Sequence, residues 1–189
     1  MRKLLLLGFL FPLIVEANWT LDSSRSEVSF ISIKNLMIAE THDFKSLEGT
    51  LDEHGRLKLS IDLDSVQTRI PIRDERMRNL LFKTANFRKA KISSVVNLSF
   101  SQSMTTGDIH RSTESFTLEI HGHKSSAKVD LAITLTGDGD VRVDSIRPVI
   151  VNAATYDMST GIEALRLIAK LANISEAVPV SFNLFFKKL

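Results

Sequence analysis

The sequence has no cysteine, few glycines and prolines, and little net charge. The absence of cysteine excludes disulfide bonds, thiolate metal sites and cysteine nucleophiles. With only 8 glycines and 4 prolines in 189 residues, collagen-like and low-complexity chains are excluded as well. A formal net charge of +2 provides no strong electrostatic footprint for nucleic acid. What remains is a chain with an ordinary hydrophobic content of 43 %, long enough for one domain with a substantial core.

The N-terminus has the pattern of a secretory signal peptide. Arg2 and Lys3 precede an almost wholly apolar run, Leu4–Val15, and Ala17 provides a small residue for cleavage. A single-pass membrane anchor is the less favoured alternative, because the run is shorter than the roughly 20 residues that a span needs. We therefore predict a signal peptide over residues 1–17 and a mature domain over 18–189, with no later stretch that spans a membrane.

Beyond this segment, hydrophobic residues repeat mostly with the period of two that marks β-strands. The plainest case is 57–66, where Leu57, Leu59, Ile61 and Leu63 alternate with polar residues. About eight such segments follow one another, and most are joined by tight-turn signals. This pattern predicts an all-β fold, an antiparallel barrel or sandwich. Eight strands are also enough for a closed barrel that holds one small ligand.

Two short helices are predicted to interrupt the strands. In the segment 65–94, Pro71 suits a turn or a strand edge. A charged run follows, in which Met77 and Leu81 lie at helical spacing. The order of strand, charged helix, aromatic-bearing loop and strand predicts a lid that keeps its charges in water and its apolar residues toward a cavity. The second helix is predicted over 161–171, where the hydrophobic period changes again.

The central segment carries a family resemblance. Thr68–Phe82, TRIPIRDERMRNLLF, followed by NFRKAKISS at Asn86–Ser94, resembles the YceI family of exported lipocalin-like proteins. Weaker matches at 28–34, 44–51 and 115–129 extend the resemblance over nearly all of the chain after residue 17. It implies an extended antiparallel eight-stranded lipocalin-like barrel with two short helices and a long apolar tunnel. It also implies a periplasmic protein that binds polyisoprenoid lipids, including isoprenoid quinones.

The sequence departs from the family pattern at one expected barrel mouth. Asn35 and Met37 stand where the family often has His and Gly. His42-Asp43-Phe44 replaces a sequence close to Gly-Arg-Phe, and the turn at 122–126 lacks the proline of the family. The changes at Asn35 and Met37 bear on the shape of that mouth and therefore on the ligand.

A lipid-binding barrel needs a dry apolar wall and a polar mouth, and it needs no catalytic group. The predicted wall residues are Phe30, Ile33, Phe44, Leu59, Ile61, Met77, Leu81, Phe82, Phe87 and Phe100. Each of them is otherwise a plain core residue. Arg69, Arg73 and Arg76 are the predicted head-group contacts, because guanidinium groups bind phosphate well. The alternative for these arginines is a solvated helix face paired with nearby carboxylates.

Two histidine motifs are weak indications of metal binding or catalysis. His121 and His123 have a spacing that a metal ion can use. However, they flank Gly122 in a predicted turn, and no third ligand is close in sequence. Thr41-His42-Asp43 has no accompanying nucleophile motif. We therefore expect no metal site, no cofactor and no catalytic residue.

The function predicted from the sequence is that of an exported, non-enzymatic binding protein. It holds a long apolar isoprenoid lipid, either a polyprenyl chain or an isoprenoid quinone, for transport, storage or sequestration. Two alternatives remain. One is a packed barrel that serves as an interaction or stress-response module, and the other is a redox helper that acts on a bound quinone. Cavity volume separates the packed barrel from the carrier. A homodimer and a transient contact with a membrane are both compatible with the sequence.

Overall fold

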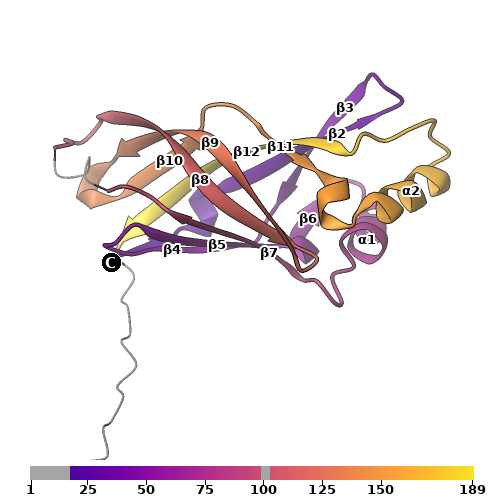
Figure 1. Cartoon of the computed structure of the whole chain (residues 1–189), viewed down its shortest axis with the longest axis horizontal. Coiled ribbons are helices and arrows are strands. Elements are labelled where there is room, and N and C mark those ends of the chain that lie inside the picture. The colour runs from indigo at the N-terminus through magenta and orange to yellow at the C-terminus, as the bar shows by residue number, and fades with distance from the viewer. Residues whose placement is uncertain (1–17, 99–102) are drawn as a thin grey trace, which may run out of the picture.

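The computed structural model describes residues 18–98 and 103–189 of the chain. The predicted signal peptide and Phe100 lie outside these ranges. The described residues form twelve strand segments in one antiparallel sheet, with two short helices at one end (Figure 1). The strands are β1 (Trp19–Leu21), β2 (Glu27–Lys34), β3 (Ile38–Phe44), β4 (Leu47–Leu51), β5 (Arg56–Asp62), β6 (Val66–Gln67), β7 (Lys89–Val95), β8 (Ile109–Ile120), β9 (His123–Leu135), β10 (Val141–Ser145), β11 (Val149–Asn152) and β12 (Ala177–Lys188).

These twelve segments make eight strands, because four of the strands are interrupted by a bend. The interrupted strands are β1 with β2, β3 with β4, β5 with β6, and β10 with β11. The members of an interrupted strand share partners; for example, β1 and β2 both pair with β12. Each strand pairs with its neighbours in chain order, and β12 closes the ring on β1 and β2. The fold is the closed eight-stranded antiparallel barrel that was predicted.

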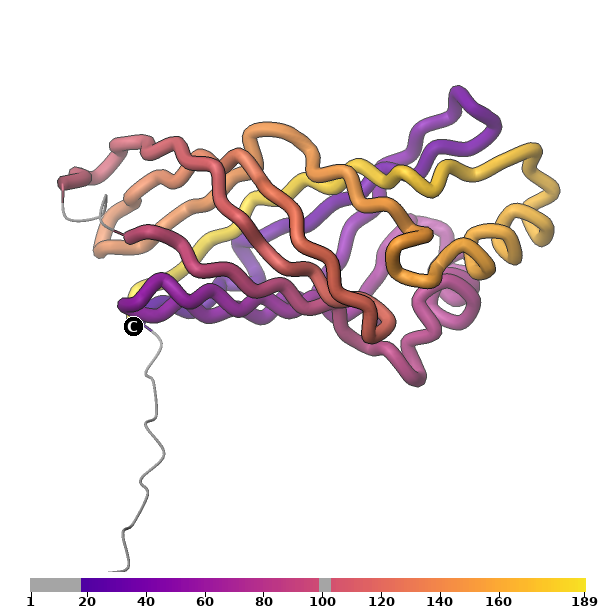
Figure 2. Tube along the Cα trace, viewed as in Figure 1, coloured from indigo at the N-terminus to yellow at the C-terminus, as the bar shows by residue number. Residues whose placement is uncertain are grey.

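The two longest strands set the length of the barrel. β8 and β9 pair along their whole length and are joined by a tight turn at His121 and Gly122, both of which have positive φ. The 12 residues of β8 rise about 40 Å, or about 30 Å along an axis inclined by roughly 40°. Figure 2 shows the resulting elongated shape, with the C-terminal strand running beside the N-terminal strands.

Both helices lie at the same end of the barrel. α1 (Pro71–Arg76) continues into the π-helical turn η3 (Met77–Phe82), and α2 (Ser159–Ile168) packs against η3. Pro71 occupies the first turn of α1, where a missing N–H breaks no helical hydrogen bond. This position corrects the prediction that Pro71 belongs to a turn or a strand edge. We call η3 and α2 together the lid.

Candidate ligand-binding cavity

The inside of the barrel contains a cavity of about 240 Å³. Its lining comes from all eight strands and from both elements of the lid. The lining reaches from Trp19, which pairs with Lys188 at the end of β12, to Ile162 in α2. Within residues 18–98 and 103–189, every side chain that lines the cavity is apolar except Ser94 and Glu114. The cavity is therefore a dry space that follows the barrel axis toward the lid.

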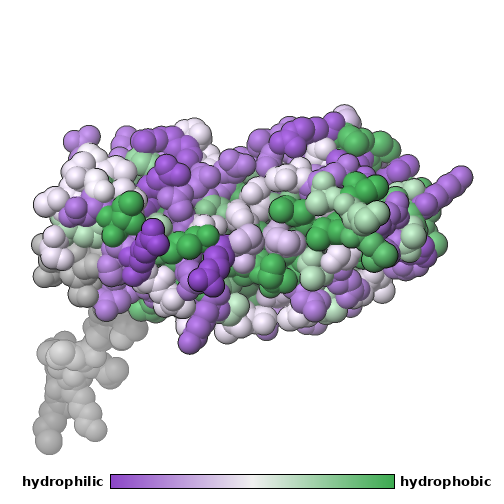
Figure 3. All heavy atoms as spheres, turned by 90° about the horizontal axis from the view of Figure 1, so that it is seen from above, coloured by the Kyte–Doolittle hydropathy of each residue, from purple (hydrophilic) through white to green (hydrophobic). Residues whose placement is uncertain are grey.

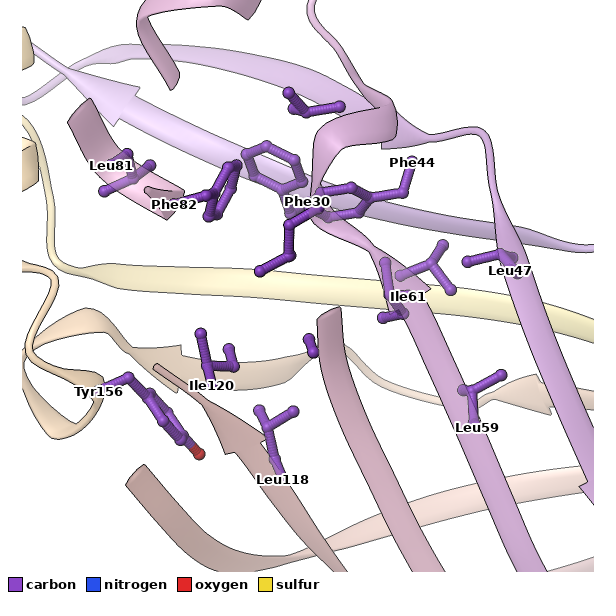
Figure 4. Close-up of a cluster of buried hydrophobic side chains, with 14 of the residues drawn as sticks. Phe30, Phe44, Leu47, Leu59, Ile61, Leu81, Phe82, Leu118, Ile120 and Tyr156 are labelled. Atoms are coloured by element: carbon purple, nitrogen blue, oxygen red, sulfur yellow. The ribbon is translucent and has the colours of Figure 1, made fainter. Parts of the chain in front are cut away.

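Six of the ten predicted wall residues line this cavity, and Figure 4 labels all six. They are Phe30, Phe44, Leu59, Ile61, Leu81 and Phe82. All of them are buried. The rings of Phe30 and Phe44 have centroids 5.3 Å apart, and those of Phe44 and Phe82 are 5.8 Å apart. These aromatic contacts connect β2 and β3 to η3 at the lid end of the cavity.

The other three wall residues within the described ranges lie elsewhere. Met77 is buried in the core but is not part of the lining. Ile33 is an odd number of positions from Phe30, so strand alternation turns it to the opposite face of β2. Phe87 is 37 % exposed and stacks on the ring of His121, with centroids 4.7 Å apart. The loop after η3 thus covers the β8–β9 turn instead of entering the barrel.

The predicted wall omitted the half of the lining that comes from the later strands. β9 contributes Val129, Leu131 and Ile133, and alternate residues from Val178 to Phe186 come from β12. The signal for them was present, because apolar residues occupy every second position of both segments.

A polar pair, buried His42 and half-buried Ser32, continues the inward face of β2 and β3 beyond the apolar wall. His42 is opposite Phe30 in the β2–β3 register, and their rings have centroids 5.1 Å apart. The Nε2 atom of His42 lies 2.8 Å from the Ser32 hydroxyl. Burial, aided by the charge of Arg73, lowers the pKa of His42, which favours the neutral imidazole. The polar pair therefore lies beside the lid end of the cavity without adding charge to it.

The pairing of Ser32 with His42 resembles the first half of a catalytic triad. In such triads, a third group accepts a hydrogen bond from the other ring nitrogen and orients the base. Here His42 Nδ1 is buried and has no hydrogen-bond partner in the part of the chain that the structure describes. Asp43, the next residue, faces the other way and contacts Arg69. The orienting group of a triad is therefore not present at this pair.

An ion-pair cluster joins the β2–β3 hairpin to α1. Glu40 accepts hydrogen bonds from Lys34 Nζ at 2.9 Å and from Arg73 at 2.7 Å. The bond from Lys34 and the charge of Arg73 hold the pKa of Glu40 below its usual value. Arg73 also donates to the carbonyl oxygen of Thr68 at 2.8 Å. These contacts fix the position of Arg73 and attach α1 to the barrel rim.

The three predicted head-group arginines occupy different settings. Arg69 donates to the Asp43 carboxylate and to the Thr41 carbonyl oxygen, each at 3.2 Å. Arg73 belongs to the cluster around Glu40. Arg76 is half-buried on α1 and forms no ion pair within residues 18–98 and 103–189. Of these three arginines, only Arg76 therefore retains an unpaired charge for an anionic group.

The two histidines considered as metal ligands lie in different environments. His121 is buried, and its Nε2 lies 2.8 Å from the carbonyl oxygen of Phe82 in the lid. His123 is exposed at the start of β9. Among the described residues, no group of three or more metal-ligating side chains lies close enough to hold an ion. None of the described helices has the length and hydrophobicity to cross a membrane.

Comparison with known families places this geometry in context. The model of the YceI-like domain matches residues 19–186 of the sequence. The chain belongs to the YceI-like domain family. This match confirms the family resemblance drawn from the segment Thr68–Phe82. No protein with a curated description matches the sequence.

Solved structures with the same fold include members from three bacteria. This YceI-like chain is 34 % identical to a polyisoprenoid binding domain from Saccharophagus degradans implicated in plant cell wall breakdown, with a TM-score of 0.89. That match covers 92 % of this chain and all of the other. BcnA of Burkholderia cenocepacia is 16 % identical, with a TM-score of 0.66 and coverage of 87 % and 98 %. A Campylobacter jejuni YCEI protein is 17 % identical, with a TM-score of 0.60 and coverage of 83 % and 91 %. The last two matches show the fold alone.

Proposed function

We propose that this YceI-like protein is an exported, non-enzymatic carrier that holds a long apolar isoprenoid lipid inside its barrel. The ligand is a polyprenyl chain or an isoprenoid quinone, and the protein acts in the periplasm to transport, store or sequester it. The observation that carries this proposal is the cavity, whose described lining residues are apolar except for Ser94 and Glu114. The name of the S. degradans relative, a polyisoprenoid binding domain, supports the same ligand class.

The energetics of such a site follow from its shape. A linear lipid can lie along a barrel about 30 Å long without bending. Burying about 400 Å² of its surface contributes on the order of 10 kcal/mol before costs. Association and the ordering of the chain take back several kcal/mol of this. Apolar burial alone is therefore sufficient, and the site needs no charged anchor within the barrel.

The cavity also weighs against the two alternatives. A packed interaction module would fill the barrel with side chains, whereas this barrel encloses about 240 Å³. A redox helper for a bound quinone would need several titratable groups beside the ligand, and among the described residues that line the cavity Glu114 is the only ionisable one. The carrier function fits both observations.

The proposal is tested by native mass spectrometry of residues 18–189 purified gently from a bacterial periplasm, followed by organic extraction. We expect a bound species with isoprenoid mass spacing. A protein that arrives empty and fails to take up added polyprenols or quinones would overturn the proposal.

Two neighbouring positions of β7 provide a matched pair of variants. Ile92 lines the cavity, whereas Ser93 is exposed on the outer face of the same strand. Ile92→Trp should fill the cavity and abolish lipid uptake, while Ser93→Trp should bind lipid like the wild type. Equal uptake by both variants would show that the lipid binds somewhere other than the barrel.

A further inference from the structure

The lid end of the barrel exposes apolar side chains on three separate segments. The tip of the β2–β3 hairpin presents Leu36 and Met37, which are 79 % and 88 % exposed. The start of α1 presents Ile72, and the end of α2 presents Leu167; these two are 51 % and 59 % exposed. In the view from above, hydrophobic side chains gather toward the half of the molecule that carries the helices and this hairpin (Figure 3).

The hairpin tip is held in a conformation that exposes these residues. Asn35 and Leu36 have φ values of 50° and 66°, in the left-handed region that a leucine rarely adopts. The Asn35 side chain accepts a hydrogen bond from the N–H of Ala172, and the Asn173 side chain accepts one from the N–H of Leu36. A strained residue persists only where its surroundings impose the strain. The connection after α2 therefore fixes the tip with Leu36 turned to solvent.

Positive charge is concentrated in the same region. Residues 69–83 contain five basic and two acidic side chains, and two of the five, Arg69 and Arg73, are paired with Asp43 and Glu40 of β3. Arg76, Arg78 and Lys83 form no ion pair with any residue that the structure describes.

Exposed apolar side chains beside unpaired cations are typical of a surface that binds an anionic bilayer. The apolar side chains enter the boundary between the lipid head groups and the acyl chains, and the cations attract the lipid phosphates. A protein interface, by contrast, is contiguous and well packed and is depleted in lysine. Here the apolar residues lie on three separate segments, and the unpaired cations include Lys83.

We propose that the lid end of this protein docks onto an anionic lipid bilayer through Leu36, Met37, Ile72 and Leu167 and the unpaired cations of residues 69–83. This inference rests on the proposed function. Leu81 and Phe82 of η3 and Ile162 of α2 line the cavity, so the lid stands between the bilayer and the bound lipid. Docking at this end lets a lipid pass between the bilayer and the barrel without crossing water.

The test uses residues 18–189 and flotation with two kinds of vesicle. One kind is phosphatidylcholine alone, and the other is phosphatidylcholine mixed with phosphatidylglycerol. We expect binding to the mixed vesicles that weakens as salt is added, and little binding to phosphatidylcholine alone. Equal binding to both, or binding to neither, would overturn the proposal.

A pair of double variants locates the docking surface. Leu36→Asn with Met37→Ser should weaken binding to the mixed vesicles by about tenfold or more, because two apolar anchors are lost. Asparagine tolerates the left-handed conformation, so this variant should fold. The control is Val95→Ser with Ile109→Ser, which removes two side chains that are 70 % and 60 % exposed near the opposite end. The control should bind vesicles like the wild type; equal losses in both variants would refute the location.

Lipid uptake from detergent solution separates this proposal from the carrier function. Leu36 and Met37 do not line the cavity, so their double variant should still take up polyprenol delivered in detergent. Vesicle binding by a protein that takes up no lipid would leave docking intact and overturn the carrier. Sedimentation equilibrium tests whether this surface instead binds a second copy of the chain. A dimer that Leu36→Asn and Met37→Ser dissociate, without vesicle binding, would assign this surface to a second copy of the chain and overturn membrane docking.

Discussion

The lid depends on close contact between α2 and η3 at Gly161, which makes this glycine a sensitive probe. A Cβ atom at Gly161 would lie 2.6 Å from the carbonyl oxygen of Leu80 and 2.8 Å from the Cα of Leu81. Both are backbone atoms, so no side-chain rotation relieves the contact. In Gly161→Ala, α2 and η3 must therefore move apart until these distances reach normal van der Waals values.

Two effects of opposite sign determine the stability of Gly161→Ala. Overpacking typically costs about 1–3 kcal/mol. Alanine in place of glycine inside a helix contributes up to about 1 kcal/mol in the other direction. We expect a net loss of about 1–2 kcal/mol in the free energy of unfolding. Because Leu81 and Ile162 line the cavity, we also expect a preloaded lipid to leave the variant faster.

Urea unfolding and lipid-release kinetics measure both effects, with Gly137→Ala as the control. A Cβ atom at Gly137 meets nothing within 4 Å, so the same change there creates no clash. The control should unfold and release lipid like the wild type. If Gly161→Ala is more stable than the wild type and releases lipid at the wild-type rate, the tight contact between α2 and η3 is refuted.

Two further predictions concern pH and the ligand. Because burial lowers the pKa of His42, the unfolded chain binds a proton there more readily, and stability should fall as pH drops from 7 to 5. Urea titrations should show a smaller fall in His42→Gln; an equal fall would mean that other groups cause it. Removing a bound lipid should lower the melting temperature, since a ligand at 100 times its Kd adds about 2.7 kcal/mol. Added polyprenol should restore it, and no response would contradict binding to the folded barrel.

Much of the barrel was predictable because strand alternation is a local property. Leu57, Leu59 and Ile61 were predicted to share one face, and all three line the cavity. The bends that divide four strands were not predictable, because they arise where the closing sheet curves. Residues 45–46 illustrate this: they separate β3 from β4, yet their sequence, Lys-Ser, contains neither glycine nor proline.

The parts of the site that were not predicted depend on which residues of separate segments meet in the folded chain. Ser32 and His42 are ten residues apart, and only the β2–β3 pairing brings them to 2.8 Å. Phe87 was expected inside because aromatic residues favour burial, but His121 offers it a stacking partner on the outside. No pattern within a single segment contains either contact. The positions of individual side chains around the lid therefore required the three-dimensional arrangement.

Closure of the ring also determines when this protein can fold. Trp19 pairs with Lys188, so the first and last strands of the barrel are partners. The sheet cannot close until the end of β12 has been synthesised, and pairings between such distant residues make folding slow. A chain with this topology cannot close its barrel while it is being made. That delay suits the export proposed above, because a chain that has not yet folded can still be threaded through a narrow translocation channel.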